Sequence, residues 1–183
     1  MEEMPTTGEH YVIETWVNRI YRQFTDRLFA ITNPQTGKVY GYAFSTWALI
    51  DTTSRQPMDL AELPNGGFSS ALIEKEIPIA GPGRIRLKNT ENAVRTRQAY
   101  YTDLDINGHV NSIRYIEMML DLFPAKQFEA SPVKRLEVAY SAEAYADDLL
   151  HFYQEPSAKG DATLVEIRKE EGRIPVVKAA VTF

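Results

Sequence analysis

The sequence predicts an α+β protein built from two antiparallel units. Three observations support this class. Three apolar segments in the first half are separated by tight turns, which join antiparallel neighbours. One wide apolar helix follows a polar turn near the middle of the second half, and four further strand-like segments come after it. Strands and a helix in this order indicate an antiparallel sheet with its helix on one face.

Composition excludes several functional classes. The 183 residues are 44% hydrophobic and 25% charged, as in an ordinary globular protein. A net charge of −5 argues against the whole chain binding nucleic acid. The absence of cysteine excludes disulfides, thiolate zinc sites and a cysteine nucleophile, and it fits the cytoplasmic location that we expect. No apolar run approaches the ~18 residues of a membrane span, and the start resembles no targeting peptide, so we expect no membrane partner.

The first half is predicted to form an antiparallel meander. Its expected strands are 10–20, 21–31 and 38–50, which are rich in β-branched and aromatic residues. Phe24 and Phe29 are expected to be buried in the second strand. Residues 33–37 form the turn before the third strand, and 68–76 are expected to form a short helix.

A proline- and glycine-containing segment divides the halves. We expect residues 1–80 to form a partial N-terminal unit, 81–92 a linker, and 93–183 a C-terminal unit. The linker carries the basic run 84–88, which is either a solvated connector or a docking patch for an acidic partner.

The second half is predicted to begin with a strand over 93–101 and to continue, after the polar turn, into a long helix. Asn111 is a suitable N-cap, and Pro124 is expected to end the helix. The apolar stripe is expected to hold Ile113, Ile116, Leu120 and Phe123. Strands are expected over 136–140, 149–153, 163–168 and 174–183. The first half has no comparable long helix.

The polar turn is the candidate site because it places Asp103, Asp105, Asn107 and His109 directly before that helix. The spacing opens like a calcium loop, but Arg114 stands at its twelfth position, where a glutamate is required. No G-x-S-x-G motif is present, and the chain has only His10 and His151 as further histidines, too few for zinc.

Hydrolysis by an activated water remains. In an extended chain, Asp105, Asn107 and His109 would point to one side, where a carboxylate can orient an imidazole and an amide can hold a carbonyl or a water. The alternative is that Asp and Asn are present because turns favour them.

The string Asp103-Leu-Asp-Ile-Asn-Gly-His-Val-Asn-Ser-Ile-Arg-Tyr-Ile116 resembles the active-site segment of bacterial and plant acyl-acyl carrier protein (acyl-ACP) thioesterases, of the FatA/FatB type. Residues 16–17, 24–27 and 45–50 resemble the same family's N-terminal strands. The resemblance implies a tandem hotdog fold, in which a long helix is wrapped by an antiparallel sheet. It also implies hydrolysis of a fatty acyl thioester on acyl carrier protein, with no cofactor and no metal.

Carried over by position, the family's catalytic residues are Asp105, Asn107, His109 and, in the Tyr-x-x-Glu pattern, Glu143. The alternative for Glu143 is a surface carboxylate at a strand end. Ala144 stands where many plant members carry a cysteine. The resemblance leaves His109 and Glu143 both open as the principal base, and backbone N–H groups near 110–112 are expected to stabilise the oxyanion.

The chain departs from the family pattern in length, because the first hotdog is expected to lack its opening strand and helix. Pairing with a second copy is one way to complete that unit. The alternative functions are an acyl-CoA hydrolase of hotdog type and a non-catalytic acyl-binding module. For an acidic carrier protein, the candidate docking residues are Arg84, Arg86, Lys88, Arg95, Arg97, Lys134 and Arg135.

Overall fold

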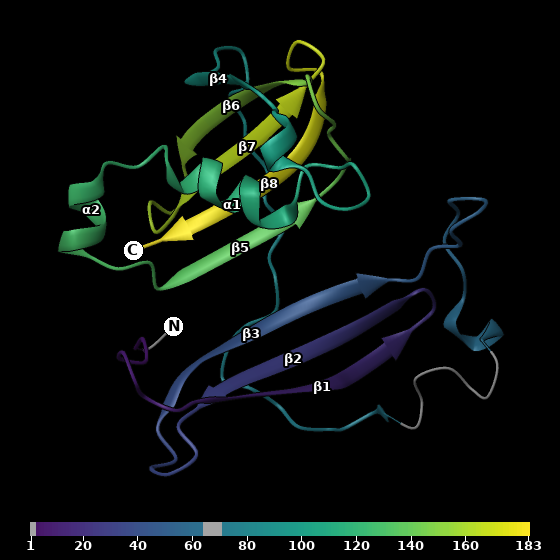
Figure 1. Cartoon of the computed structure of the whole chain (residues 1–183), viewed down its shortest axis with the longest axis vertical. Coiled ribbons are helices and arrows are strands. Elements are labelled where there is room, and N and C mark those ends of the chain that lie inside the picture. The colour runs from purple at the N-terminus through teal and green to yellow at the C-terminus, as the bar shows by residue number, and fades with distance from the viewer. Residues whose placement is uncertain (1–2, 64–70) are drawn as a thin grey trace. The chain divides into compact units, whose positions relative to one another are not determined.

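The computed structural model describes residues 3–63 and 71–183 (Figure 1). The chain divides into two compact units, Met1–Pro82 and Gly83–Phe183. Each unit has its own sheet and its own hydrophobic core. Within the described residues, no helix is long and apolar enough to cross a bilayer.

The first unit contains the predicted antiparallel meander. Its strands, in the order β1-β2-β3, are β1 Val12–Tyr21, β2 Phe24–Thr32 and β3 Val39–Ala48. The turn before β3 closes as expected, because Asn33 Oδ1 accepts hydrogen bonds from the backbone N–H groups of Gln35 and Thr36. Gly37 completes it with a φ of +70°, a conformation that costs glycine little.

One face of this sheet carries the small core of the unit. Trp16, Leu28 and Ala30 are buried there, and Phe44 packs against them. The prediction that Phe24 and Phe29 are buried is wrong, since both are only partly covered. Phe24 is the first residue of β2, and Phe29 lies on the opposite face from Leu28 because side chains alternate along a strand.

In the described part of the first unit, the 3₁₀ helix Leu60–Glu62 is present and no α-helix is. Of the short helix predicted over 68–76, residues 68–70 lie outside the described residues. From Leu72 on, the chain contradicts the prediction: Leu72 forms a parallel bridge with Val17, and Ile73 N–H donates to the Val17 carbonyl. A backbone pairing with β1 thus replaces the internal hydrogen bonds of a helix.

The second unit is a five-stranded antiparallel sheet with the order β4-β6-β7-β8-β5. Its strands are β4 Arg95–Gln98, β5 Arg135–Tyr140, β6 Leu149–Pro156, β7 Thr163–Lys169 and β8 Ile174–Thr182. The four predicted strands after the helix are confirmed. β4 is shorter than the predicted 93–101, because a 3₁₀ turn over Tyr101–Asp103 follows it.

Helix α1, Ser112–Leu120, crosses one face of this sheet (Figure 1). Asn111 is its N-cap, as predicted, and the Asn111 Oδ1 accepts a 2.9 Å hydrogen bond from Ile113 N–H. Tyr115, Met118 and Met119 are its buried residues and join the sheet core. Ile113 was expected in the apolar stripe, but 57% of its surface is exposed. It lies in the first turn, on the side away from Met119.

The expected long helix ends early. α1 stops at Leu120, because the Leu122 and Phe123 N–H groups bond to carbonyls three residues back and tighten the chain out of the α-helix. Pro124 is not the terminator. It is the N-cap position of a second helix, α2 Ala125–Ala130, where a missing N–H costs nothing.

The segment after Gly83 runs along the sheet face opposite α1. Gly83 N–H donates to Glu137 Oε2 on β5, and the N–H groups of Lys88 and Asn89 donate to the carboxylate of Glu155 on β6. The neighbours of Glu137 in β5 pack toward the α1 core, so Glu137 faces the other way. Leu87, which belongs to this segment, is buried.

Candidate functional site

The polar turn is closed rather than extended. Asp105 N–H donates to the His109 carbonyl at 2.8 Å, and Leu104 bridges to Val110. Gly108 has a φ of +79°, which allows the chain to reverse here. The expectation that alternate side chains point to one side is therefore wrong: the turn sets Asp105 opposite His109 and leaves Asn107 at its exposed tip.

Asp105 holds the turn through its carboxylate. Oδ1 accepts the Asn107 N–H at 2.8 Å and the His109 N–H at 3.3 Å. The bond from the Asn107 backbone is the main cause of a lowered Asp105 pKa. The His109 amide, the Asn107 side chain and the charge of His109 add to it against the opposing effect of burial. Asp105 is thus ionised, and its carboxylate accepts the backbone hydrogen bonds that close the turn.

His109 and Glu143 meet from two segments of the chain. His109 Nε2 lies 3.5 Å from Glu143 Oε2. Backbone pairing brings them together, since His109 forms an antiparallel bridge with Tyr145, and Val110 N–H donates to the Ala144 carbonyl at 2.8 Å. Glu143 itself lies three residues beyond the end of β5, not within the strand.

A pocket of about 220 Å³ lies between this turn, the start of α1 and the end of β5. It brings together three of the four predicted site residues; Asn107 is not in its lining. The lining residues are Asp105, His109, Val110, Asn111, Ser112, Tyr115, Tyr140, Ala142 and Glu143.

Backbone donors near the start of α1 are mostly occupied. Val110 N–H bonds to Ala144, and Asn111 N–H donates to the Asp103 carbonyl at 2.8 Å. Of the three backbone amides predicted to stabilise the oxyanion, only Ser112 N–H is left as a donor. Within the described residues, no carbonyl or side chain accepts a hydrogen bond from it.

Three tyrosines around the pocket escaped the sequence prediction. Tyr140 donates to the Ser112 carbonyl at 3.2 Å, and Tyr145 donates to Glu143 Oε2 at 3.1 Å. Burial raises the pKa of the Tyr115 phenol, so this side chain stays neutral. The spacing Tyr140-x-x-Glu143-x-Tyr145 could have predicted the contact of Tyr145 with Glu143, because side chains two positions apart in an extended chain lie on the same side.

Asp103 supports the turn from beneath. It is only 3% exposed, and its carboxylate forms a two-point ion pair with Arg97 at 2.8 and 3.1 Å. Burial by itself would raise the Asp103 pKa, but the Arg97 bonds, the Tyr100 N–H and the nearby charges of Arg97 and Arg114 leave it lowered. Asp103 is a buried anchor.

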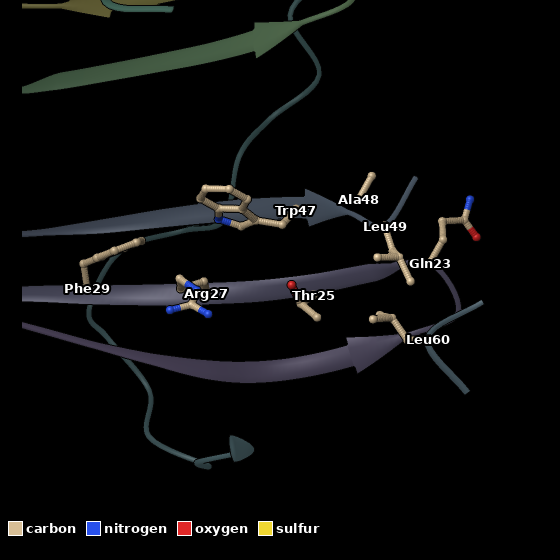
Figure 2. A pocket seen from close by; sticks show the side chains of 8 residues that line it. All are labelled: Gln23, Thr25, Arg27, Phe29, Trp47, Ala48, Leu49 and Leu60. Atoms are coloured by element: carbon tan, nitrogen blue, oxygen red, sulfur yellow. The ribbon is translucent and has the colours of Figure 1, made fainter. Parts of the chain in front are cut away.

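The first unit has a separate pocket of about 390 Å³ (Figure 2). It opens on the face of the sheet away from Leu28. Apolar side chains dominate its wall, together with the Arg27 guanidinium. The lining residues are Gln23, Thr25, Arg27, Phe29, Trp47, Ala48, Leu49 and Leu60.

Metal-binding side chains are not gathered at either pocket. Over 3–63 and 71–183, no group of three His, Asp or Glu residues is arranged to hold an ion. His10 is exposed in the first unit, and His151 lies in β6 with Nε2 buried.

Comparison with known proteins places both units. Residues 87–183 match the Acyl-ACP thioesterase C-terminal domain, and residues 1–63 match the Acyl-ACP thioesterase N-terminal domain. A chloroplastic palmitoyl-acyl carrier protein thioesterase of Gossypium hirsutum is 23% identical over 154 residues, which cover 82% of this chain and 37% of that protein. This chain thus spans well under half the length of that curated relative.

Solved structures agree. An acyl-ACP thioesterase from Bacteroides thetaiotaomicron is 40% identical with a TM-score of 0.90, covering 100% of this chain and 72% of that one. The 12:0-ACP thioesterase of Umbellularia californica shares the fold at 21% identity, with a TM-score of 0.81 over 97% of this chain and 69% of that one. The predicted α+β hotdog class is confirmed. The chain belongs to the acyl-ACP thioesterase family.

Proposed function

We propose that this chain carries the catalytic groups of a thioester hydrolase that releases fatty acid from acyl-[acyl carrier protein]. The observation that carries the proposal is the 3.5 Å approach of His109 Nε2 to Glu143 Oε2 at a pocket beside the first turn of α1. Family membership and the names of the similar proteins supply the substrate class.

In the proposed reaction, the His109–Glu143 pair takes a proton from water. The water oxygen bonds to the thioester carbonyl carbon, the carbon–sulfur bond breaks, and the departing sulfur receives the proton that the pair took from water. Ser112 N–H is aligned with the positive end of α1 and supports the oxyanion. Asp105 keeps the turn closed, and Asn107 at its tip helps hold the incoming substrate.

The test is thiol release from acyl carrier protein thioesters of graded chain length. His109→Ala and Glu143→Ala should each lower turnover by about 10²–10⁴-fold, the usual contribution of a positioned acid or base. His10→Ala and Glu171→Ala are matched controls, because both residues are exposed and neither lines the pocket. Wild-type turnover by either site variant would refute the assignment.

The carrier is decided by comparing rates on matched acyl-acyl carrier protein and acyl-CoA. Equal or faster hydrolysis of acyl-CoA would favour the CoA-specific alternative. Bound fatty acid without thiol release would favour a non-catalytic acyl-binding module. The observation that favours this alternative is the lack of an α-helix in the described part of the first unit.

Fewer basic residues are available to dock an acidic carrier protein than the sequence of this chain predicts. Arg97 is paired with buried Asp103, and Arg135 is paired with Glu137 at 2.7 Å. Arg84, Arg86 and Lys88 are exposed, with Ile85 and Leu87 turned inward between them. We assign docking to these three and Arg95. If raising the salt concentration leaves the KM for acyl carrier protein substrates unchanged, this assignment fails.

A further inference from the structure

A third side chain contacts the His109–Glu143 pair. The Tyr145 hydroxyl donates to Glu143 Oε2 at 3.1 Å, and Oε2 is the same atom that lies 3.5 Å from His109 Nε2. The Tyr145 ring also meets the imidazole edge to face, with ring centres 5.2 Å apart and planes at 86°. One residue thus touches both members of the pair.

Tyr145 is held in this place from several directions. Its backbone pairs with His109, and its N–H donates to Asp148 Oδ2 at 2.9 Å. Lys169 Nζ lies 5.3 Å above the ring and 3.6 Å from the Asp148 carboxylate. A cation over the ring face and a paired backbone restrict the rotation of the phenol, although 46% of the residue is exposed.

Glu143 needs such support. It lies beyond the end of β5, and its side chain is 41% exposed, so solvent and rotamer freedom compete with the geometry that the pair requires. The other two tyrosines do not supply it: the Tyr140 hydroxyl is directed to the Ser112 carbonyl, and the Tyr115 hydroxyl is buried.

We propose that Tyr145 is a positioning residue for the hydrolysis, which fixes the Glu143 carboxylate with its hydroxyl and the His109 imidazole with its ring. The proposal rests on the proposed function. The two parts of the Tyr145 side chain have different roles: the hydroxyl holds Glu143, and the ring holds His109. The proposal therefore predicts different effects for phenylalanine and leucine at this position.

The first experiment measures kcat and KM for Tyr145→Phe with acyl carrier protein thioesters. We expect kcat to fall about tenfold to a hundredfold with KM within about twofold, the loss of one hydrogen bond to a charged acceptor. Tyr145→Leu should fall further, because it also removes the ring. Tyr101→Phe is the matched control: Tyr101 is 86% exposed and outside the pocket, so its kcat should equal that of the wild type. An unchanged kcat in Tyr145→Phe, or a change in KM alone, would overturn the proposal.

A double-mutant cycle tests whether Tyr145 acts through Glu143. In a Glu143→Ala background, adding Tyr145→Phe should cost less than about twofold, because its partner is already absent. A full additive loss would show that the hydroxyl acts elsewhere and would refute the positioning role.

NMR of the His109 ring protons gives a readout that does not depend on activity. These signals should move in Tyr145→Leu, which loses the ring current, and stay nearly in place in Tyr145→Phe. If the wild type releases no thiol from any substrate, the proposed function fails. The NMR comparison then still decides whether Tyr145 holds His109, and equal shifts in both variants would refute that contact.

Discussion

Single residues set the chemistry of the turn through backbone geometry. Asp105 and His109 face each other because the chain reverses between them, and the reversal depends on Gly108. A side chain at Gly108 would meet no atom within 4 Å, so any penalty there is conformational rather than steric crowding by neighbours. The closed geometry of this turn therefore depends on a residue that contributes no functional group.

Gly108→Ala should lower the free energy of unfolding of the second unit by about 1–2 kcal/mol, the cost of a left-handed conformation for an L-residue. It should also lower kcat at least about tenfold, because a partly opened turn displaces His109 from Glu143. Gly160→Ala is the matched control, with a φ of +73° and open space around it in a remote turn. Denaturant melts and kinetics of both variants check this. Equal activity in the two would mean that the closed turn is not needed.

At the scale of elements, the turn is tied to β4 and α1 through Asp103. Its carboxylate binds Arg97 on β4, and its carbonyl accepts the Asn111 N–H at the start of α1. Arg97 Nη1 also lies 3.3 Å from Met118 Sδ, inside the helix face that packs on the sheet. The pair thus joins strand, turn and helix at the base of the candidate site.

Asp103→Asn should cost about 1–3 kcal/mol of unfolding free energy at pH 7, because it leaves Arg97 without its ionic partner. The pKa of Asp103 is lowered below its ordinary 3.8, so its contribution is complete above that value. It is lost as pH falls through the lower, folded-state pKa. The difference between wild type and variant should therefore shrink in acid.

Denaturant melts between pH 7 and pH 3 measure this difference. Glu117→Gln is the control, because it removes a carboxylate from the Arg114–Glu117 pair, whose side chains are 44% and 53% exposed. Such a pair contributes about 0–1 kcal/mol. A pH-independent cost for Asp103→Asn would contradict the ionic account.

Across the whole molecule, the sequence predicts the features that depend on residues close together along the chain. Asn111 correctly predicts the start of α1, and the apolar and β-branched residues correctly predict the strands of both units. Ile113 was misplaced because helical spacing does not tell which side of a short first turn meets the sheet. The contact of Tyr145 with His109 depends on pairing between segments 36 positions apart, which no local spacing encodes.

Trp47 can report whether the pocket of the first unit binds a ligand. This pocket includes Trp47, which is 59% exposed, whereas Trp16, the only other tryptophan, is 4% exposed on the opposite face of the sheet. If the pocket takes part of an acyl chain, a saturated fatty acid should transfer Trp47 from water to an apolar contact and shift its emission to shorter wavelength. Arg27 on the same wall provides a charge for a carboxylate.

Titration of the intact chain with fatty acids from eight to eighteen carbons tests this, because each buried methylene should add about 0.8 kcal/mol to the binding free energy. Trp16→Phe should retain the blue shift and Trp47→Phe should lose it, while a displacement assay shows that both variants still bind. Persistence of the shift in Trp47→Phe would place the ligand elsewhere, and no shift with any chain length would exclude this pocket as an acyl site. An affinity that rises with chain length and then levels off would measure how many methylenes the pocket holds, since only buried ones add to the binding free energy.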